Sequence, residues 1–277
     1  LGLQHKLADK LVLSKVRDVV GGPKNFFSAG GAPLSKDIEE FFFAVGLLVC
    51  EGYGLTETSP MVTFNTPKAF KFGTVGKPII DCQVKIGEDG EILVKSPSVT
   101  QGYYNKPQAT AVAFSDGWFH TGDIGQFDEE GFLVITDRLK DLIITSGGKN
   151  VAPQKIETVY AKDHFIEQFI VIGDRFKFIS ALLVPNFEVL EAYAQEQGIT
   201  FRSYEELVAK DEIYAFYKER LASRAEELAN YEQVKLFTLL PRPFTQETGE
   251  ITPSQKMKRR VIIKNYAEQI AAMYAED

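Results

Sequence analysis

Apolar residues recur at a helical spacing at the start of the chain. Leu3, Leu7, Leu11 and Val16 share this spacing, and Gly21 and Gly22 follow them, so a helix is predicted from about residue 3 to 20. "KNFFSAG" then predicts a short buried strand, "APLSKDIEEFFFAV" a helix and "LLVCEGYG" a second strand. Strand, helix and strand in this order indicate a parallel α/β layer.

From about residue 72 the apolar pattern becomes an alternation with a period of two. "CQVKIGEDGEILVKS" holds two alternating runs around Asp89 and Gly90, and "GQFDEEGFLVITD" holds two more around "DEEG". Both segments predict β-hairpins. We therefore expect residues 72–139 to form an antiparallel β subdomain, either a small barrel or a sandwich.

A third pattern begins near residue 140. "KDLIITSGG", "FIEQFIVIGD", "FKFISALLVPN" and "KLFTLLP" predict strands, and Pro153 predicts the start of a helix that runs through Ala161. Residues 187–230 are mostly helical and charged in pattern. "TPSQKMKRRVIIKNYAEQIAAMY" predicts a final helix with Pro253 near its start.

These patterns predict an α/β plus α+β fold with two domains. One domain would cover residues 1–139, with an α/β layer to about residue 71 and a β-rich part over 72–139. Residues 140–277 would be a small α+β domain. No Gly/Ser linker lies between them, so the joint near Lys140 is expected to act as a short hinge.

Composition narrows the classes of protein. The 277 residues are 44% hydrophobic and 25% charged, which is ordinary for a globular protein, and the net charge of −7 does not attract nucleic acid. Cys50 and Cys82 have no ligand-like spacing, which argues against a zinc site or a disulfide framework and favours a reducing, cytoplasmic setting. The longest apolar run, Phe41 to Cys50, is too short to cross a bilayer. Leu1, inside a predicted helix, is not expected to be a natural start.

Four polar clusters carry candidate chemistry. In "SAGGAPLS", Gly30 and Gly31 let the backbone approach a flat ligand, and in "EGYGLTETSP" Tyr53 could stack on a base. Thr56 could donate to a phosphate oxygen and Glu57 could hold Mg²⁺. The plain alternative for both clusters is an ordinary turn with solvated polar side chains.

The other two clusters lie further along the chain. In "DGWFHTGDIG", Asp123 could accept two hydrogen bonds from a ribose diol, or it could be a simple turn aspartate. In "DRLKDLIITSGGKNVAP", Arg138 offers a fork of donors for ribose or phosphate oxygens, whereas "TSGGKN" does not fit the phosphate-loop pattern. "KMKRR" could be a solvated helix face or a nucleic-acid patch, and the acidic balance and lack of interleaved aromatics argue against the second.

The order of the motifs is more specific than any one of them. "GGAPLS", "GYGLTE", "GEILVKSPSVTQGYYNKPQAT", "DGWFHTGDIG", "DRLKDLIITSGGKNVAP" and "TPSQKMKRR" follow one another over the whole chain. With these motifs the chain resembles the adenylate-forming enzyme superfamily, and most closely the bacterial long-chain fatty acid–CoA ligases. The resemblance implies that a fatty acid and ATP form acyl-AMP and pyrophosphate, and that the acyl group then passes to CoA.

The resemblance also implies a role for each matching residue. Thr56 would contact the phosphates, Glu57 would bind Mg²⁺, and Lys256 would bridge the carboxylate and the α-phosphate, so these three would be catalytic. Lys140 would be the hinge, Gly147 and Gly148 would face the CoA tunnel, and Lys149 would lie near the CoA phosphates. The other nucleotide-binding residues would be Gly30, Gly31, Ala32 and Pro33 at the adenine, Tyr53 packed on it, Gly54, Asp123 on the ribose and Arg138 beside Asp123.

The chain departs from the family pattern in two places. The Ser/Thr/Gly-rich loop that grips the β- and γ-phosphates is absent from the sequence, and Gln255 stands where many relatives have glycine before the lysine. The chain therefore resembles the second half of a ligase. The resemblance implies that residues 1–139 are the C-terminal part of the large ATP- and acyl-binding domain and that residues 140–277 are the small C-terminal lid domain. We expect the chain to make no acyl-AMP by itself.

The implied partners are the small molecules fatty acid, ATP and CoA, with Mg²⁺ and without nucleic acid. Peripheral contact with the inner face of a membrane and self-association through exposed apolar surface stay open. Two alternatives also stay open: transfer of the acyl group to a carrier-protein phosphopantetheine, and a nucleotide-binding module without catalysis.

Overall fold

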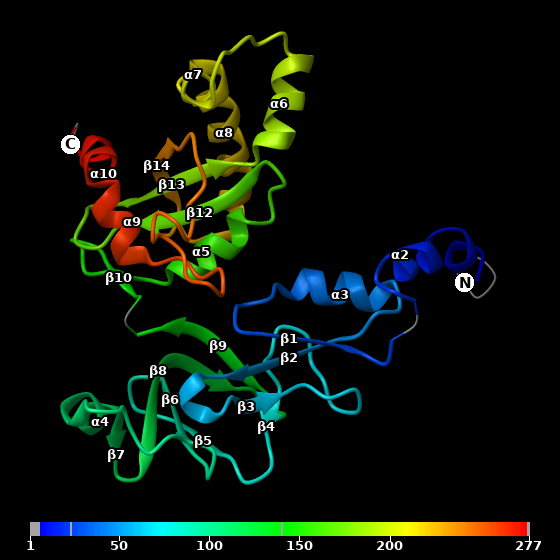
Figure 1. Cartoon of the computed structure of the whole chain (residues 1–277), viewed down its shortest axis with the longest axis vertical. Coiled ribbons are helices and arrows are strands. Elements are labelled where there is room, and N and C mark those ends of the chain that lie inside the picture. The colour runs from blue at the N-terminus through cyan, green and yellow to red at the C-terminus, as the bar shows by residue number, and fades with distance from the viewer. Residues whose placement is uncertain (1–5, 23, 140, 276–277) are drawn as a thin grey trace. The chain divides into compact units, whose positions relative to one another are not determined.

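The protein folds into two compact units, Leu1–Lys140 and Asp141–Asp277. The computed structural model describes residues 6–22, 24–139 and 141–275 (Figure 1). Several separate sheets with helices make up the two units, so the predicted α/β plus α+β fold class is confirmed. Within the described residues, no helix has the length and apolar character that a membrane span requires.

The described part of the first unit begins with a helical segment, as the spacing of its apolar residues predicts, whereas residues 3–5 of the predicted helix lie outside the described residues. A π-helical turn, η1 (Asp9–Leu13), continues directly into α2 (Ser14–Val19). Arg17 holds this segment in place, because its guanidinium lies 2.7 Å from the Asp9 carboxylate and donates to the Val45 carbonyl at 2.9 Å. The backbone reverses at Gly21 and Gly22, which both have positive φ.

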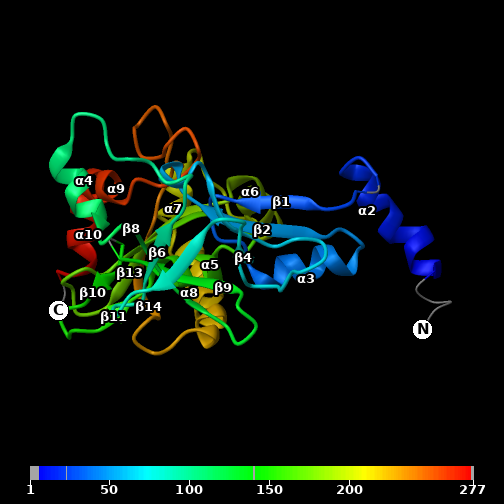
Figure 2. The ribbon, with the colours of Figure 1, turned by 90° about the horizontal axis from the view of Figure 1, so that it is seen from below.

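A four-stranded sheet forms the centre of the first unit. Its strands are β1 (Phe27–Gly30), β2 (Val49–Gly54), β3 (Met61–Phe64) and β4 (Lys77–Pro78), in that order. β1 and β2 pair in parallel as predicted, and the crossover between them is α3 (Lys36–Ala44), which lies along β2 (Figures 1 and 2). β3 and β4 are antiparallel additions. The parallel layer is therefore limited to one strand pair.

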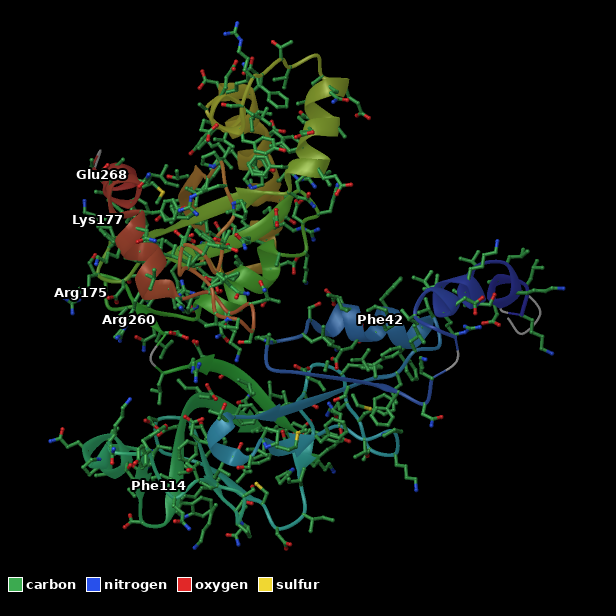
Figure 3. The ribbon with its side chains drawn as sticks, in the orientation of Figure 1. Phe42, Phe114, Arg175, Lys177, Arg260 and Glu268 are labelled. Atoms are coloured by element: carbon green, nitrogen blue, oxygen red, sulfur yellow. The ribbon has the colours of Figure 1, made fainter. Side chains whose placement is uncertain are left out.

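The prediction that β1 is a buried strand is wrong. Its residues alternate between half-buried and exposed, since β1 lies at the edge of the sheet and pairs only with β2. On α3, Phe42 is half-buried (Figure 3), whereas Phe41 and Phe43 are exposed. The apolar residues of these two segments thus predicted the strand and the helix correctly, but they did not predict how far the side chains are buried.

A five-stranded antiparallel sheet completes the first unit. It contains β5 (Gln83–Ile86), β6 (Glu91–Lys95), β7 (Phe114–Ser115), β8 (Trp118–Phe127) and β9 (Leu133–Arg138), with α4 (Pro107–Ala113) beside β7 and β8 (Figure 1). The β5–β6 and β8–β9 hairpins are those that the period-two pattern predicts. Both sheets of the unit supply a shared apolar cluster that includes Val62 on β3 and Ile92 on β6.

The second unit is built on a three-stranded sheet. β12 (Ile166–Ile172) pairs antiparallel with β13 (Ile179–Pro185), and β14 (Val234–Leu239) pairs in parallel with β13. All seven residues of β13 are buried. Helix α5 (Pro153–Tyr160) packs on β12, and a small hairpin joins β10 (Ile143–Ile144) to β11 (Asn150–Val151).

The predicted helical insertion is confirmed between β13 and β14. It consists of α6 (Phe187–Glu196), α7 (Tyr204–Val208), α8 (Asp211–Arg224) and η3 (Ala225–Glu227) (Figure 1). Arg220 on α8 donates three hydrogen bonds of 2.8–3.0 Å to the buried carboxylate of Asp163. This ion pair ties the insertion to the loop before β12.

The predicted final helix begins later than expected. Residues 251–258 form a loop, and the helices are α9 (Arg259–Asn265) and α10 (Ala267–Met273). Thr252 explains the difference, because its backbone N–H donates to the Lys256 carbonyl and its hydroxyl accepts from the Lys256 N–H at 3.0 Å. Such local side-chain bonds compete with helix formation. Pro253 therefore lies inside the loop and not at a helix start.

The second unit should fold without the first. Its main apolar cluster, from Ile143 to Met273, lies wholly within residues 141–277. A protein consisting of residues 141–277 is expected to unfold cooperatively in urea when followed by circular dichroism. Leu183→Ala, at a fully buried position of β13, should lower its free energy of unfolding by about 2–5 kcal/mol. A broad, probe-dependent transition would contradict an independent unit.

Candidate functional site

The site in the first unit begins with a pair of residues on neighbouring strands. Asp123 on β8 and Arg138 at the end of β9 are directly opposite each other in the antiparallel register. The Arg138 Nε atom lies 3.1 Å from Asp123 Oδ1. Asp123 is only 9% exposed, so the guanidinium supplies charge compensation that a buried carboxylate requires.

Tyr53 reaches the same carboxylate from the other sheet. Its hydroxyl donates to Asp123 Oδ2 at 2.7 Å, although the two residues are far apart in the sequence. Burial, together with the Asp123 charge, raises the pKa of Tyr53, so the phenol stays protonated and remains a donor. Tyr53, Asp123 and Arg138, three of the predicted nucleotide-binding residues, are therefore brought together.

A second carboxylate supports the backbone next to Asp123. Glu91 at the start of β6 accepts from the Gly122 N–H at 2.8 Å through Oε1. Its Oε2 atom lies 2.6 Å from His120 Nδ1, and His120 Nε2 lies 2.8 Å from the Ser115 hydroxyl. The sequence analysis missed Glu91 and His120. The available signal was a charged residue at the start of the otherwise apolar run "EILV".

Thr56 and Glu57 lie in the 3₁₀ turn η2 (Thr56–Thr58), directly after β2. Gly54 is required here, since a Cβ atom at this position would come within 1.7 Å of the Pro60 carbonyl oxygen. Tyr103, which the sequence analysis did not single out, donates its hydroxyl to Glu57 Oε1 at 2.9 Å. The Thr100 N–H donates to the Glu57 carbonyl at 2.7 Å. The loop around Tyr103 thus fixes the position of η2.

The Glu57 carboxylate fits a magnesium ion that is held mainly by phosphate. Within residues 6–22, 24–139 and 141–275, no group of three or more His, Cys, Asp or Glu side chains could form a metal site. Mg²⁺ in nucleotide sites typically binds one or two carboxylates together with substrate phosphates and water. A single half-buried glutamate three residues after the strand that carries Tyr53 is consistent with that donor set.

The glycine turn after β1 is the next part of the site. Gly30 lies opposite Gly52 in the parallel pair, and a Cβ atom at Gly30 would be 2.9 Å from the Gly52 carbonyl oxygen. Gly31 has a φ of 86°, a conformation that side chains disfavour. Ala32 and Pro33 follow as exposed residues, so this turn offers open backbone to a flat ligand.

Glu51 ties that turn to β2. Its Oε1 atom accepts from the backbone N–H of Leu34 at 3.3 Å, and Glu39 on α3 accepts from the Gly73 N–H at 2.6 Å. The two carboxylates are 5% and 1% exposed. Burial, and then the charge of Glu39, raises the pKa of Glu51 to about 7. The sequence analysis placed Glu51 in the predicted strand "LLVCEGYG" and gave it no role.

The second unit carries the remaining candidates. Gly147, Gly148 and Lys149 form the turn between β10 and β11, closed by a hydrogen bond from the Gly148 N–H to the Thr145 carbonyl. Lys149 Nζ lies 5.8 Å from the centre of the Tyr231 ring. Lys256 is exposed in the loop before α9. Lys140, the predicted hinge, lies outside the described residues.

Several charged residues lie on one side of the second unit. Arg175, Lys177 and Arg260 lie on the same side of the unit in Figure 3, together with the acidic Glu268. Phe176, which alternates with two of these cations, is stacked on Tyr274 with ring centres 3.8 Å apart. Tyr274 thus covers one face of the Phe176 ring.

Comparison with known proteins follows the same division. The family described as AMP-binding enzyme matches residues 3–104, and the family described as AMP-binding enzyme C-terminal domain matches residues 140–277. The long-chain-fatty-acid–CoA ligase FadD15 of Mycobacterium tuberculosis is 39% identical over 278 residues, which cover 100% of this chain and 46% of that protein. The peroxisomal long chain acyl-CoA synthetase 7 of Arabidopsis thaliana is 35% identical, over 97% of this chain and 41% of that protein.

Solved structures show similar folds. The adenylation domain of a carboxylate reductase from Mycobacterium chelonae matches with a TM-score of 0.78 and 25% identity, over 98% of this chain and 42% of that one. The O-succinylbenzoate coenzyme A synthetase of Bacillus subtilis, in complex with AMP, matches with a TM-score of 0.64 and 29% identity, over 90% and 48%. The chain spans less than half the length of these relatives.

The buried carboxyl of Glu51 should make the stability of the first unit depend on pH. Its folded pKa of about 7 exceeds the ordinary value of 4.5, so the folded unit binds the proton more tightly and stability falls as pH rises through this window. Glu51→Gln removes this dependence. At pH 8 the variant should be more stable by up to about 3 kcal/mol, with little change at pH 4.5.

Urea unfolding followed by Trp118 fluorescence measures this effect, since Trp118 is the single tryptophan and lies on β8 of the first unit. Glu88→Gln, at an exposed glutamate of the same unit, is the matched control and should leave the pH dependence unchanged. Equal pH dependence in the parent chain and Glu51→Gln would show that Glu51 does not hold a proton in the folded state.

Proposed function

Since the chain belongs to the AMP-binding enzyme family, we propose that it is part of an ATP-dependent long-chain fatty acid–CoA ligase. Such an enzyme forms acyl-AMP and pyrophosphate from a fatty acid and ATP, and then transfers the acyl group to the CoA thiol. The observation that carries this proposal is the junction of Tyr53, Asp123 and Arg138. Its support is that Tyr53 lies on β2, the strand that pairs with β1 before the glycine turn and that precedes η2 in the chain.

In this proposal Asp123 binds the ribose. Oδ1 faces Arg138 and Oδ2 accepts from Tyr53. A carboxylate has about four lone-pair sites, so the two ribose hydroxyls of AMP could also donate to it. Arg138 places an opposite charge beside the carboxylate, and Tyr53 donates to its second oxygen. The adenine would lie against the backbone of the turn at Gly30, Gly31, Ala32 and Pro33.

The phosphates would then meet η2. The Thr56 hydroxyl would donate to a phosphate oxygen, and the Glu57 carboxylate would hold Mg²⁺, which supplies positive charge to the phosphates. Tyr103 orients Glu57 through the hydrogen bond to Oε1, which leaves Oε2 for the metal. Gly54 allows the sharp turn that brings η2 next to the strand carrying Tyr53.

Lys256 would act in the first half-reaction. A carboxylate oxygen of the fatty acid attacks the α-phosphorus, the bond from that phosphorus to the β-phosphate bridging oxygen breaks, and pyrophosphate leaves. Negative charge gathers where carboxylate and phosphate meet, so a lysine ammonium aimed at that point lowers the barrier. Gly147, Gly148 and Lys149 would serve the CoA step, with rotation at Lys140 between the two arrangements.

The choice of CoA as the acceptor is supported by the two relatives with 39% and 35% identity, a CoA ligase and an acyl-CoA synthetase by name. Transfer to a carrier-protein phosphopantetheine would need a docking surface for that protein. The remaining alternative is a module that binds nucleotide without catalysis. In that case Lys256 would have no catalytic role, whereas our proposal gives it one.

Nucleotide binding can be tested on the chain itself. We expect Asp123→Asn to weaken AMP binding about 10- to 100-fold in calorimetric titration, because hydrogen bonds to a charged group contribute about 1.5–3 kcal/mol. Asp116→Asn, at an exposed turn of the same sheet, should bind AMP like the parent chain. Asp123→Asn should also lose discrimination against 2′-deoxy-AMP. Unchanged affinity in Asp123→Asn would refute the ribose assignment.

The role of Lys256 requires both half-reactions, measured in a full-length protein that contains this chain. Lys256→Ala is expected to slow ATP–pyrophosphate exchange about 10²–10³-fold, the typical loss of one preorganised donor. Transfer to CoA from supplied acyl-AMP should change less than about twofold, since the charge that Lys256 neutralises is absent from that step. Equal slowing of both steps, or of neither, would exclude the adenylation role.

A further inference from the structure

We propose that Glu250 is a positioning residue for the fatty acid activation step: its buried carboxylate fixes the loop that presents Lys256. The inference rests on the proposed function of Lys256. It concerns a residue that does not touch substrate and that acts only through the loop of residues 251–258. Nothing in the motif "TPSQKMKRR" includes Glu250, which lies two residues before Thr252.

The Glu250 carboxylate is the most fully engaged acidic group of this loop region. It is 0% exposed and accepts four hydrogen bonds from three side chains. Arg242 donates from both terminal nitrogens, at 2.8 Å to Oε2 and 3.0 Å to Oε1, Thr248 donates at 2.6 Å and Asn265 at 3.0 Å. Burial alone would raise the pKa of Glu250, but these donors lower it to about 2, so the carboxylate is ionised at every working pH.

Each donor comes from a different part of the second unit. Arg242 lies just after β14, Thr248 lies in the turn before the loop, and Asn265 is the last residue of α9. The Arg242 segment is itself fixed, because the Phe244 N–H donates to the Gln168 side chain on β12 at 2.6 Å and the Gln168 amide returns a bond to the Phe244 carbonyl. Glu250 therefore joins the strand side and the helix side at the base of the loop.

The backbone carries this fixed position from Glu250 to Lys256. The Lys258 N–H donates to the Glu250 carbonyl at 2.7 Å, and Ile251 and Met257 form the next bridge. The Thr252 N–H then donates to the Lys256 carbonyl at 2.8 Å, and the Lys256 N–H donates to the Thr252 hydroxyl at 3.0 Å. These backbone hydrogen bonds and the bridge thus connect the residue with the buried carboxylate, Glu250, to the exposed Lys256.

Arg259 anchors the other end of the loop, where α9 begins. Its guanidinium donates to the Val171 carbonyl on β12 and to the Glu157 carboxylate on α5, both at 2.6 Å. The loop is therefore held at its base while its tip is open. Among the described residues, the Lys256 ammonium has no ion-pair partner, so the backbone at the tip alone determines where its long side chain starts.

This geometry predicts how a change at Glu250 reaches the reaction. In Glu250→Gln an amide NH₂ replaces one carboxylate oxygen and faces donors. One of the two Arg242 bonds is then lost in either amide orientation, together with the Asn265 bond at Oε1 or the Thr248 bond at Oε2. The base of the loop then loosens and Lys256 is displaced. A misplacement of about 1 Å can slow a reaction about 10²-fold, so we expect adenylation to slow about 10- to 100-fold. The CoA step, which does not use Lys256, should change less than about twofold.

The first experiment measures both half-reactions in a full-length ligase that contains this chain, for Glu250→Gln, Lys256→Ala and the double variant. If Glu250 acts through Lys256, Glu250→Gln should slow adenylation no further in the Lys256→Ala background. Asp163→Asn is the matched control, since Asp163 is equally involved in a buried arginine pair of this unit but does not touch the loop. It should leave the ratio of the two half-reaction rates unchanged.

The possible failures are distinguishable. If Lys256→Ala leaves adenylation unchanged, the proposed function of Lys256 is wrong. If Lys256→Ala slows adenylation but Glu250→Gln does not, or slows it equally with and without Lys256, only the positioning role of Glu250 is wrong. Equal slowing of both half-reactions in Glu250→Gln would likewise reduce Glu250 to a residue that stabilises the unit.

The second experiment uses the 277-residue chain and does not depend on activity. Hydrogen exchange should become at least tenfold faster at the Lys256 and Lys258 amides in Glu250→Gln, and should stay unchanged there in Asp163→Asn. If Glu250→Gln does not fold, Asn265→Ala removes a single donor and should give the same pattern with a smaller increase. Unchanged exchange at these amides in the folded variants would overturn the proposal.

Discussion

The hydrogen bond from Tyr53 to Asp123 is the contact on which the candidate site depends. It joins β2 of the β1–β4 sheet to β8 of the β5–β9 sheet, and both residues are buried. Burying a carboxylate in this position would cost free energy of folding if its charge were not compensated by nearby partners. Arg138 supplies the opposite charge and Tyr53 a neutral hydrogen-bond donor. The Asp123 carboxylate therefore connects side chains from both sheets.

Buried glutamates play a comparable part elsewhere in the chain. Glu51 accepts from the backbone N–H of Leu34, Glu91 from that of Gly122, and Glu250 receives four side-chain bonds at the base of a loop. Each stands next to a segment that the motifs assign to substrate handling. Loops have few apolar contacts of their own, and a carboxylate can hold such a backbone because it accepts several bonds in different directions.

The sequence predicted the elements that depend on neighbours in the chain. The hairpins around Asp89 and around "DEEG" are such cases, since alternation and turn residues are local signals. The final helix was predicted too early, because the bonds between Thr252 and Lys256 compete with helix formation and leave no trace in apolar spacing. Glu91 could not be found as a partner of Gly122, since that contact joins positions 31 residues apart. Each site motif alone has a plain structural alternative, so the motifs could be recognised only from their order along the chain.

The parallel pairing of β13 with β14 has a consequence for how the second unit reaches its fold. Ile179 pairs with Val234, and the helices α6, α7 and α8 lie between these two positions in the chain. This long loop must therefore close before β14 can pair with β13. The β12–β13 hairpin needs no such closure and can form first, whereas contacts between distant positions form slowly. Until β14 arrives, one edge of the most apolar strand of the unit is open to other chains. The rate at which the helical insertion condenses therefore sets how long the nascent unit is exposed to aggregation.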